Sequence, residues 1–194
     1  MEILNEKKTT EILEKFCEKF GRNKDKVVRR YLKHSVIRIP FLGSLEFGGP
    51  LPYMLCPQNK SEKKLLDIYE DVITFEIRKF RKSGRTDTSA MRYFLTLVKN
   101  FFIKENIKSV YAVGNWINRD LAKHAVKFTI DDFPETIINT IIFDNYMFPE
   151  NIEWIVAQDH EGIFFFAGKK SFVDKFKKIY KEYDKYLSLI HISE

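Results

Sequence analysis

Aromatic side chains are the feature that most limits what this chain can fold into. Its 194 residues include 18 Phe, 9 Tyr and 2 Trp, and hydrophobic residues make up 44% of the sequence. Side chains of this size leave water by packing against one another, so the composition excludes a disordered chain. A chain of this length buries roughly 70% of its unfolded surface, which is enough to enclose them. The composition therefore predicts a folded globular protein with a large core.

Glycine and proline, which interrupt regular structure, are scarce and unevenly placed. The chain has 8 Gly and 6 Pro, whereas average usage gives about 14 and about 10. Long elements and short loops are therefore expected. More than half of the Pro and over a third of the Gly lie between residues 40 and 57. The sequence predicts an irregular surface there, and hence a place for a site.

Helices are predicted wherever apolar residues recur three or four positions apart. The first helix is expected to end at Gly21, because glycine readily adopts the left-handed conformation that ends a helix. The helix over residues 61–82 is apolar on more than one face, so we expect it to be the longest and to lie centrally. The predicted helices begin near residues 9, 23, 61, 88, 134 and 171.

Strands are predicted where short apolar runs lie between turn signals. A β-like segment covers residues 35–56, and a short buried strand covers residues 110–113. Residues 153–157 and 163–167 are expected to form a hairpin, with a turn through residues 158–162. The hairpin indicates that at least these two strands pair antiparallel.

These elements predict a single α+β domain over residues 1–186, in which a small, mostly antiparallel sheet packs against several helices. Residues 1–34 are a candidate helical subdomain at its N-terminal end. Residues 187–194 resemble the translation of a common sequencing adapter, so we expect them to be a non-native tail. His191 lies in this tail and is therefore left out of every candidate site.

Composition also bears on the cellular location. No apolar run approaches the roughly 18 residues that a membrane span needs, and the N-terminus lacks the apolar region of a signal peptide. Cys17 and Cys56 lie in apolar contexts and are expected to be buried thiols in a reducing cytoplasm. The formal charge of +6 permits contact with nucleic acid or an acidic protein without requiring either. We therefore expect a cytoplasmic protein that has no membrane partner.

Residues 14–33 suggest a DNA-binding hypothesis. The pattern Phe16-Cys17-x-x-Phe20-Gly21-x-Asn23-x-x-x-Val27 resembles the helix-turn-helix of bacterial repressors. It departs from that motif at Arg22 and Arg30, where apolar packing residues are usual. The alternative is an ordinary amphipathic helix pair with a solvated charged face. The candidate nucleic-acid contacts are Asn23, Lys24, Lys26, Arg29, Arg30 and Lys33.

A denser basic cluster extends from the end of the predicted 61–82 helix into the next one. Cations are favoured at a helix C-terminus in any case, so a solvated helix end is one interpretation. The other is a surface for an anionic partner, because guanidinium groups pair well with carboxylates and phosphates. The arginines concerned are Arg78, Arg81, Arg85 and Arg92.

Aromatic residues in predicted loops are candidate anchors for a protein partner, because such residues commonly anchor interfaces. Their alternative role is packing beneath the loops. The candidates are Phe41, Phe47, Tyr53 and Tyr146.

Catalysis is the least supported class. His160 lies between two carboxylates in the predicted hairpin turn and could titrate near neutral pH. Neighbouring residues of a strand point to opposite faces, however, so the three side chains cannot all meet one substrate atom. Cys56 has no activating base nearby in the sequence, and the histidines show no metal-binding spacing. We therefore expect no catalytic residues, metal or cofactor, with an enzyme centred on His160 as an alternative.

The C-terminal third resembles a family of binding proteins. The run from Phe148 to Trp154, the turn from Asp159 to Gly162 and the aromatic strand that ends at Ala167-Gly168 are similar to segments of small bacterial immunity proteins. The resemblance implies inhibition of a toxin by binding, without chemistry, and it transfers no site residues. We therefore expect an inhibitor of the immunity type that occludes an acidic protein, such as a toxin or nuclease-like effector, in conflict between microbes, mobile elements or phages. A DNA-binding regulator is the main alternative.

Overall fold

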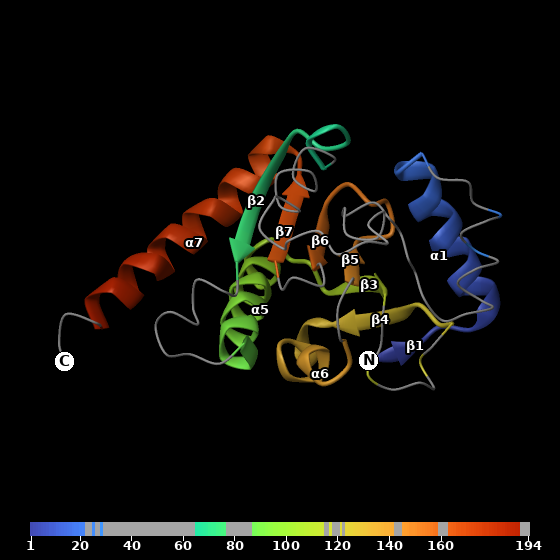
Figure 1. Ribbon diagram of the computed structural model, residues 1–194, viewed down its shortest axis with the longest axis horizontal. Coiled ribbons are helices and arrows are strands. Elements are labelled where there is room, and N and C mark those ends of the chain that lie inside the picture. The colour runs from blue at the N-terminus through green and yellow to red at the C-terminus, as the bar shows by residue number, and fades with distance from the viewer. Residues whose placement is uncertain are drawn as a thin grey trace, which may run out of the picture.

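In the part of the chain that the structure describes, a seven-stranded antiparallel sheet forms the centre (Figure 1). The computed structural model describes residues 1–21, 25, 28, 65–76, 87–114, 117, 121, 123–141, 145–158 and 163–190. The predicted α+β class and the antiparallel pairing are confirmed. From one edge to the other, the strands are β1 (Glu2–Ile3), β4 (Val126–Thr129), β3 (Ser109–Val113), β5 (Asn145–Phe148), β6 (Ile155–Gln158), β7 (Ile163–Gly168) and β2 (Asp71–Glu76).

Both faces of this sheet are covered by helices. Along β7, Phe164 and Phe166 point into one hydrophobic core, while Phe165 points into the other. Antiparallel sheets with one wet face alternate apolar and polar residues. Here both faces are dry, which explains why β7 is a continuous apolar run whose six residues are all buried.

The first core lies beneath α5 (Asp87–Lys104) and α7 (Lys170–Ile190), and we call it the α5 core. Aromatic rings fill it. Phe94 stacks on Phe164 with the ring centroids 4.5 Å apart, and Phe166 stacks on Phe176 at 4.3 Å. The short helix α6 (Glu135–Ile138) follows the 3-10 turn η3 (Ile130–Asp132) and closes one end through Ile137. The helices predicted near residues 88 and 171 are therefore confirmed.

The second core lies beneath α1 (Glu6–Lys19), and we call it the α1 core. Asn5 caps α1, because its side-chain oxygen accepts the Lys8 N–H at 2.9 Å. Phe16, on the buried side of α1, packs against the rings of Tyr146 and Phe148, and its exposed fraction is 0%. Gly21 follows α1 with a φ of 59°, as the sequence predicts. Cys17 is fully buried, which confirms that prediction.

The predicted helix over 61–82 is wrong. Leu65 and Leu66 form a helical turn, but residues 71–76 form β2, the last strand of the sheet. Val72, Ile73 and Phe75 favour a strand because they are β-branched or aromatic. The apolar residues on more than one face, which led to the prediction of a central helix, belong in part to this strand. Among the described residues the longest helix is instead α7, whose 21 residues end at Ile190.

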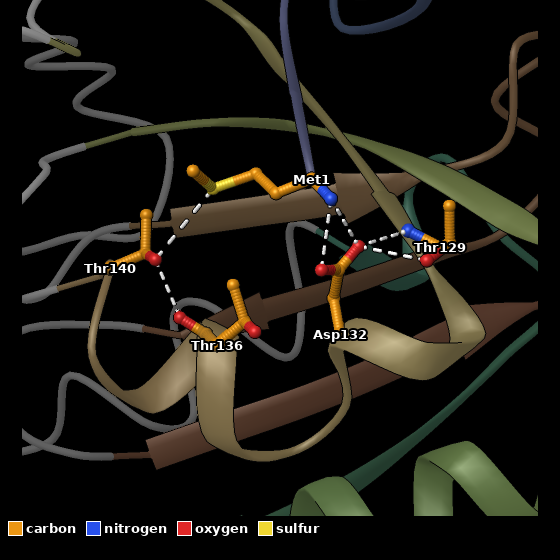
Figure 2. Close-up of polar contacts among 5 residues, drawn as sticks. All are labelled: Met1, Thr129, Asp132, Thr136 and Thr140. Carbon is orange, nitrogen blue, oxygen red and sulfur yellow. Dashed lines mark hydrogen bonds and ion pairs between the residues drawn. The ribbon is translucent and has the colours of Figure 1, made fainter.

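The N-terminus is attached to the sheet and to the turn after β4 (Figure 2). The Met1 amine lies 2.9 Å from the Asp132 carboxylate, which also accepts the Thr129 N–H and hydroxyl at 2.7 and 2.9 Å. Thr140 donates to the Thr136 carbonyl and lies 3.8 Å from the Met1 sulfur. These contacts fix β1 beside β4, where Glu2 pairs with Lys127.

Candidate protein interface

Strand β2 lies at an edge of the sheet. Its six residues pair with β7 from Asp71 opposite Gly168 to Glu76 opposite Ile163. No other strand among the described residues pairs with its outer side. We call this outer side the β2 edge. Sheet edges of this length are unusual without protection, because their backbone groups attract another strand.

Helix α7 holds β2 in place along its length (Figure 1). The carboxylate of Glu70, just before β2, accepts the Lys170 N–H at 2.9 Å, at the first residue of α7. The Lys177 ammonium lies 2.6 Å from the Asp71 carboxylate, and only 19% of the Asp71 side chain is exposed. Near the other end of β2, the Phe75 ring meets Tyr180 edge-on at 6.0 Å. The strand is therefore fixed in its extended conformation.

One hydrogen bond shows which backbone groups face outward. The Val72 N–H donates to the Asp71 side chain at 2.8 Å, so it points away from β7. Backbone groups of alternate residues in a strand point the same way. The N–H and C=O of Thr74 therefore also point outward, whereas those of Ile73 point to β7. Asp71 occupies the first outward donor, and no strand in the described part of the chain pairs with the groups around Thr74.

The side chains of β2 offer an incomplete surface on both faces of the sheet. Ile73 packs on the α5 core but is only partly buried, because no strand lies beyond it among the described residues. On the other face, the Thr74 hydroxyl is buried and makes no hydrogen bond within the described part of the chain. An added strand would cover Ile73.

Arg92 is the one arginine of the predicted cluster that lies among the described residues. Its side chain is 48% exposed, and its two donor nitrogens lie 2.7 and 3.0 Å from the Glu135 carboxylate oxygens. Hydrogen bonding to Glu135 raises the pKa of Arg92, and the same contact lowers the pKa of Glu135. The pair ties α5 to α6. An acidic partner group would therefore have to compete with Glu135 for two of the five N–H donors of this guanidinium.

Tyr146 does not lie in a loop, so its predicted role as a surface anchor is wrong. It is the second residue of β5, its exposed fraction is 1%, and its ring lies 5.3 Å from that of Phe16. Phe148, next but one along β5, packs on the same ring at 5.2 Å. The sequence suggested a loop because Pro149 follows, yet proline is also favoured in the turn that directly follows a strand.

The remaining predicted site residues lie outside the described part of the chain. Within the helix-turn-helix pattern, residues 25 and 28 are described as helical, and Val28 packs against the α1 core. Either hypothesis for that segment accommodates this packing. The residues outside the description are Arg78, Arg81, Arg85, Phe41, Phe47, Tyr53, Asn23, Lys24, Lys26, Arg29, Arg30, Lys33, Cys56 and His160.

The β2 edge was not predicted from the sequence, although the β-branched and aromatic run from Val72 to Phe75 was a signal for it. Within the described ranges, no group of three or more His, Cys, Asp or Glu residues could hold a metal ion. No helix in the same ranges has the length and apolarity to cross a membrane. Comparison with family models, curated proteins and solved structures finds no match to this chain.

Proposed function

We propose that this protein is a non-enzymatic binding module of the inhibitor or immunity type, which occludes a partner protein with an acidic surface. The observation that carries this proposal is the β2 edge. It combines outward-facing backbone groups at Thr74, a partly covered Ile73 and a strand that α7 holds extended. Edges of this kind bind proteins by accepting an added strand.

The mechanism is strand addition followed by steric occlusion. A segment of the partner pairs with β2 through main-chain hydrogen bonds, so its backbone is the first determinant of affinity. Because β2 is already ordered, little conformational entropy is lost on this side of the contact. Once bound, this protein covers the surface of the partner, and no covalent bond is made or broken.

Positive charge orients an acidic partner and accelerates its encounter with this protein. The net charge of the chain is +6, and the cluster of Arg78, Arg81 and Arg85 begins two residues after β2 in the sequence. Complementary charge accelerates encounter and excludes wrong partners more than it adds affinity. The partner that fits is a protein with Asp or Glu residues beside an exposed edge or extended segment.

The test is a proline at Thr74. Proline lacks an N–H but is tolerated at edge positions whose N–H faces away from the sheet. Thr74→Pro should therefore keep the pairing with β7 and block an incoming strand. Thr74→Ala is the matched control, because it keeps the N–H. Ile73→Pro tests the assignment of directions, because it removes a donor to β7 and should lower the Tm far more than Thr74→Pro.

Wild type and the Thr74 variants are used to capture proteins from the native host, and the captured protein is then purified and titrated. We expect wild type and Thr74→Ala to bind it in a fixed ratio and inhibit its activity. Thr74→Pro should bind at least about tenfold more weakly, the loss of roughly 1.4 kcal/mol. Equal binding by Thr74→Pro, or binding that leaves the partner active, would contradict the proposal.

A further inference from the structure

Two buried amide side chains lie next to each other where β5 begins and β6 ends. Asn145 and Gln158 are directly paired across the two strands, and each has an exposed fraction of 1%. Side chains of directly opposed residues point to the same face, with Cβ atoms about 5 Å apart. Met147 and Val156, two residues further along each strand, belong to the α5 core. The two amides therefore lie on the α5 side of the sheet.

The surroundings of Gln158 are apolar. Phe164 is opposite Gln158 on β7, and its ring is covered by that of Phe94 at 4.5 Å. Neither the Oε1 nor the Nε2 of Gln158 makes a hydrogen bond in the part of the chain that the structure describes. Buried amides in folded proteins nearly always have a partner, and an unsatisfied one is destabilising. A fold without another use for this position would be more stable with an apolar residue.

We propose that Gln158, with Asn145 beside it, lines a binding site for a small neutral molecule that presents a hydrogen-bond donor next to an acceptor. An amide carries both an NH2 donor and a carbonyl acceptor, so the group that satisfies it is complementary in the same way. Carboxamides and nucleobases share this donor–acceptor edge. A charged ligand is excluded, because Met147, Val156 and Phe164 would remove its hydration without replacing it.

The first experiment measures the Tm of the full chain with four probes. Nicotinamide represents the carboxamides and adenine the nucleobases. Their matched controls are nicotinate, which lacks the donor, and purine, which lacks the amino group. We expect nicotinamide or adenine to raise the Tm by about 2 to 4 °C at roughly five times its Kd, with a smaller effect of its control. Which of the two acts identifies the source of the edge.

The second experiment repeats the measurement on Gln158→Met, which keeps the size of the side chain and removes both polar groups. This variant should have a Tm equal to or above that of wild type, and it should no longer respond to the active probe. Ile12→Val, in the α1 core, and Thr74→Pro, at the β2 edge, should keep the response. Retention by Thr74→Pro also separates this site from the proposed protein interface.

Three results would overturn the inference. They are the absence of a Tm rise in wild type with both nicotinamide and adenine, an unchanged probe response in Gln158→Met, and a Tm of Gln158→Met clearly below that of wild type. The last result would mean that the amide is satisfied within the folded chain, for example by a structural water.

Discussion

Gly168 offers the sharpest test of the packing around Trp154. It is the last residue of β7, and a Cβ placed on it would lie 2.9 Å from the Trp154 Cβ. Cβ atoms do not approach this closely, and a Cβ cannot swing away as the end of a long side chain can. Gly168→Ala should therefore force the two backbones apart.

The expected size of the effect follows from two opposing terms. Overpacking a core costs about 1–3 kcal/mol, while replacing Gly by Ala stabilises by about 0.4–1 kcal/mol through the unfolded chain. The Trp154 ring cannot shift easily, because it packs on Phe102 at 4.9 Å and on Phe172 at 5.7 Å. The net loss should be about 1–2 kcal/mol, which lowers the Tm by about 2 to 8 °C.

Urea and thermal unfolding measure this loss, and Gly21→Ala is the comparison. Nothing lies within 4 Å of a Cβ at Gly21, but its φ is 59°, so that substitution is destabilising through the backbone alone. Near-UV circular dichroism should change for Gly168→Ala, which displaces Trp154, and not for Gly21→Ala. A Gly168→Ala protein as stable as wild type would refute the steric argument, because the entropic term alone would then prevail.

Two further substitutions, at Asp132 and at Asn5, test contacts that hold the N-terminal segment. Burial alone would raise the pKa of Asp132, but hydrogen bonds from the Met1 amine and Thr129 lower it by more. The pKa therefore lies below its ordinary value. The carboxylate therefore stabilises the fold above about pH 4, and this contribution is lost as the pH falls through the lowered pKa. Asp132→Asn should cost about 1–2 kcal/mol at pH 7 and progressively less in acid; a difference that stays constant with pH would argue against the ion pair. Asn5→Ala should cost about 1 kcal/mol by removing the cap of α1, whereas Asn5→Asp should be neutral, as urea unfolding of both variants would reveal.

Local patterns predicted most of the helices. α1 and α5 each carry an apolar stripe, and the end of α1 could be placed from Gly21, which adopts a positive φ. The hairpin of β6 and β7 was also predicted, and its antiparallel pairing is confirmed. These elements are recognisable because the apolar stripe or turn that defines each of them is formed by residues close together in the sequence.

Strands covered on both sides were harder to recognise. β5 has four buried residues in a row and was interpreted as a loop, while Val72 to Phe75 was assigned to a helix. A continuous apolar run has no period, and periodicity is the signal that separates helix from strand. Gln158 was expected in the hairpin turn, yet it is the last residue of β6 and is buried.

The candidate sites depend on contacts that no local pattern contains. Arg92 was a candidate from its own sequence context, but its partner Glu135 is 43 residues away in the chain. The burial of Gln158 depends on Asn145 and Phe164 on neighbouring strands. Among the described strands, β2 pairs only with β7 and so lies at the end of the strand order. This position is a property of the whole sheet.

The two margins of the sheet differ in length, and this difference has a consequence for stoichiometry. β1 comprises two residues, so it could offer an incoming backbone only a bond or two, whereas β2 comprises six. Among the described strands, only β2 therefore offers an edge long enough for strand addition. A copy that binds through one such edge is expected to form a closed one-to-one complex and not a row of copies.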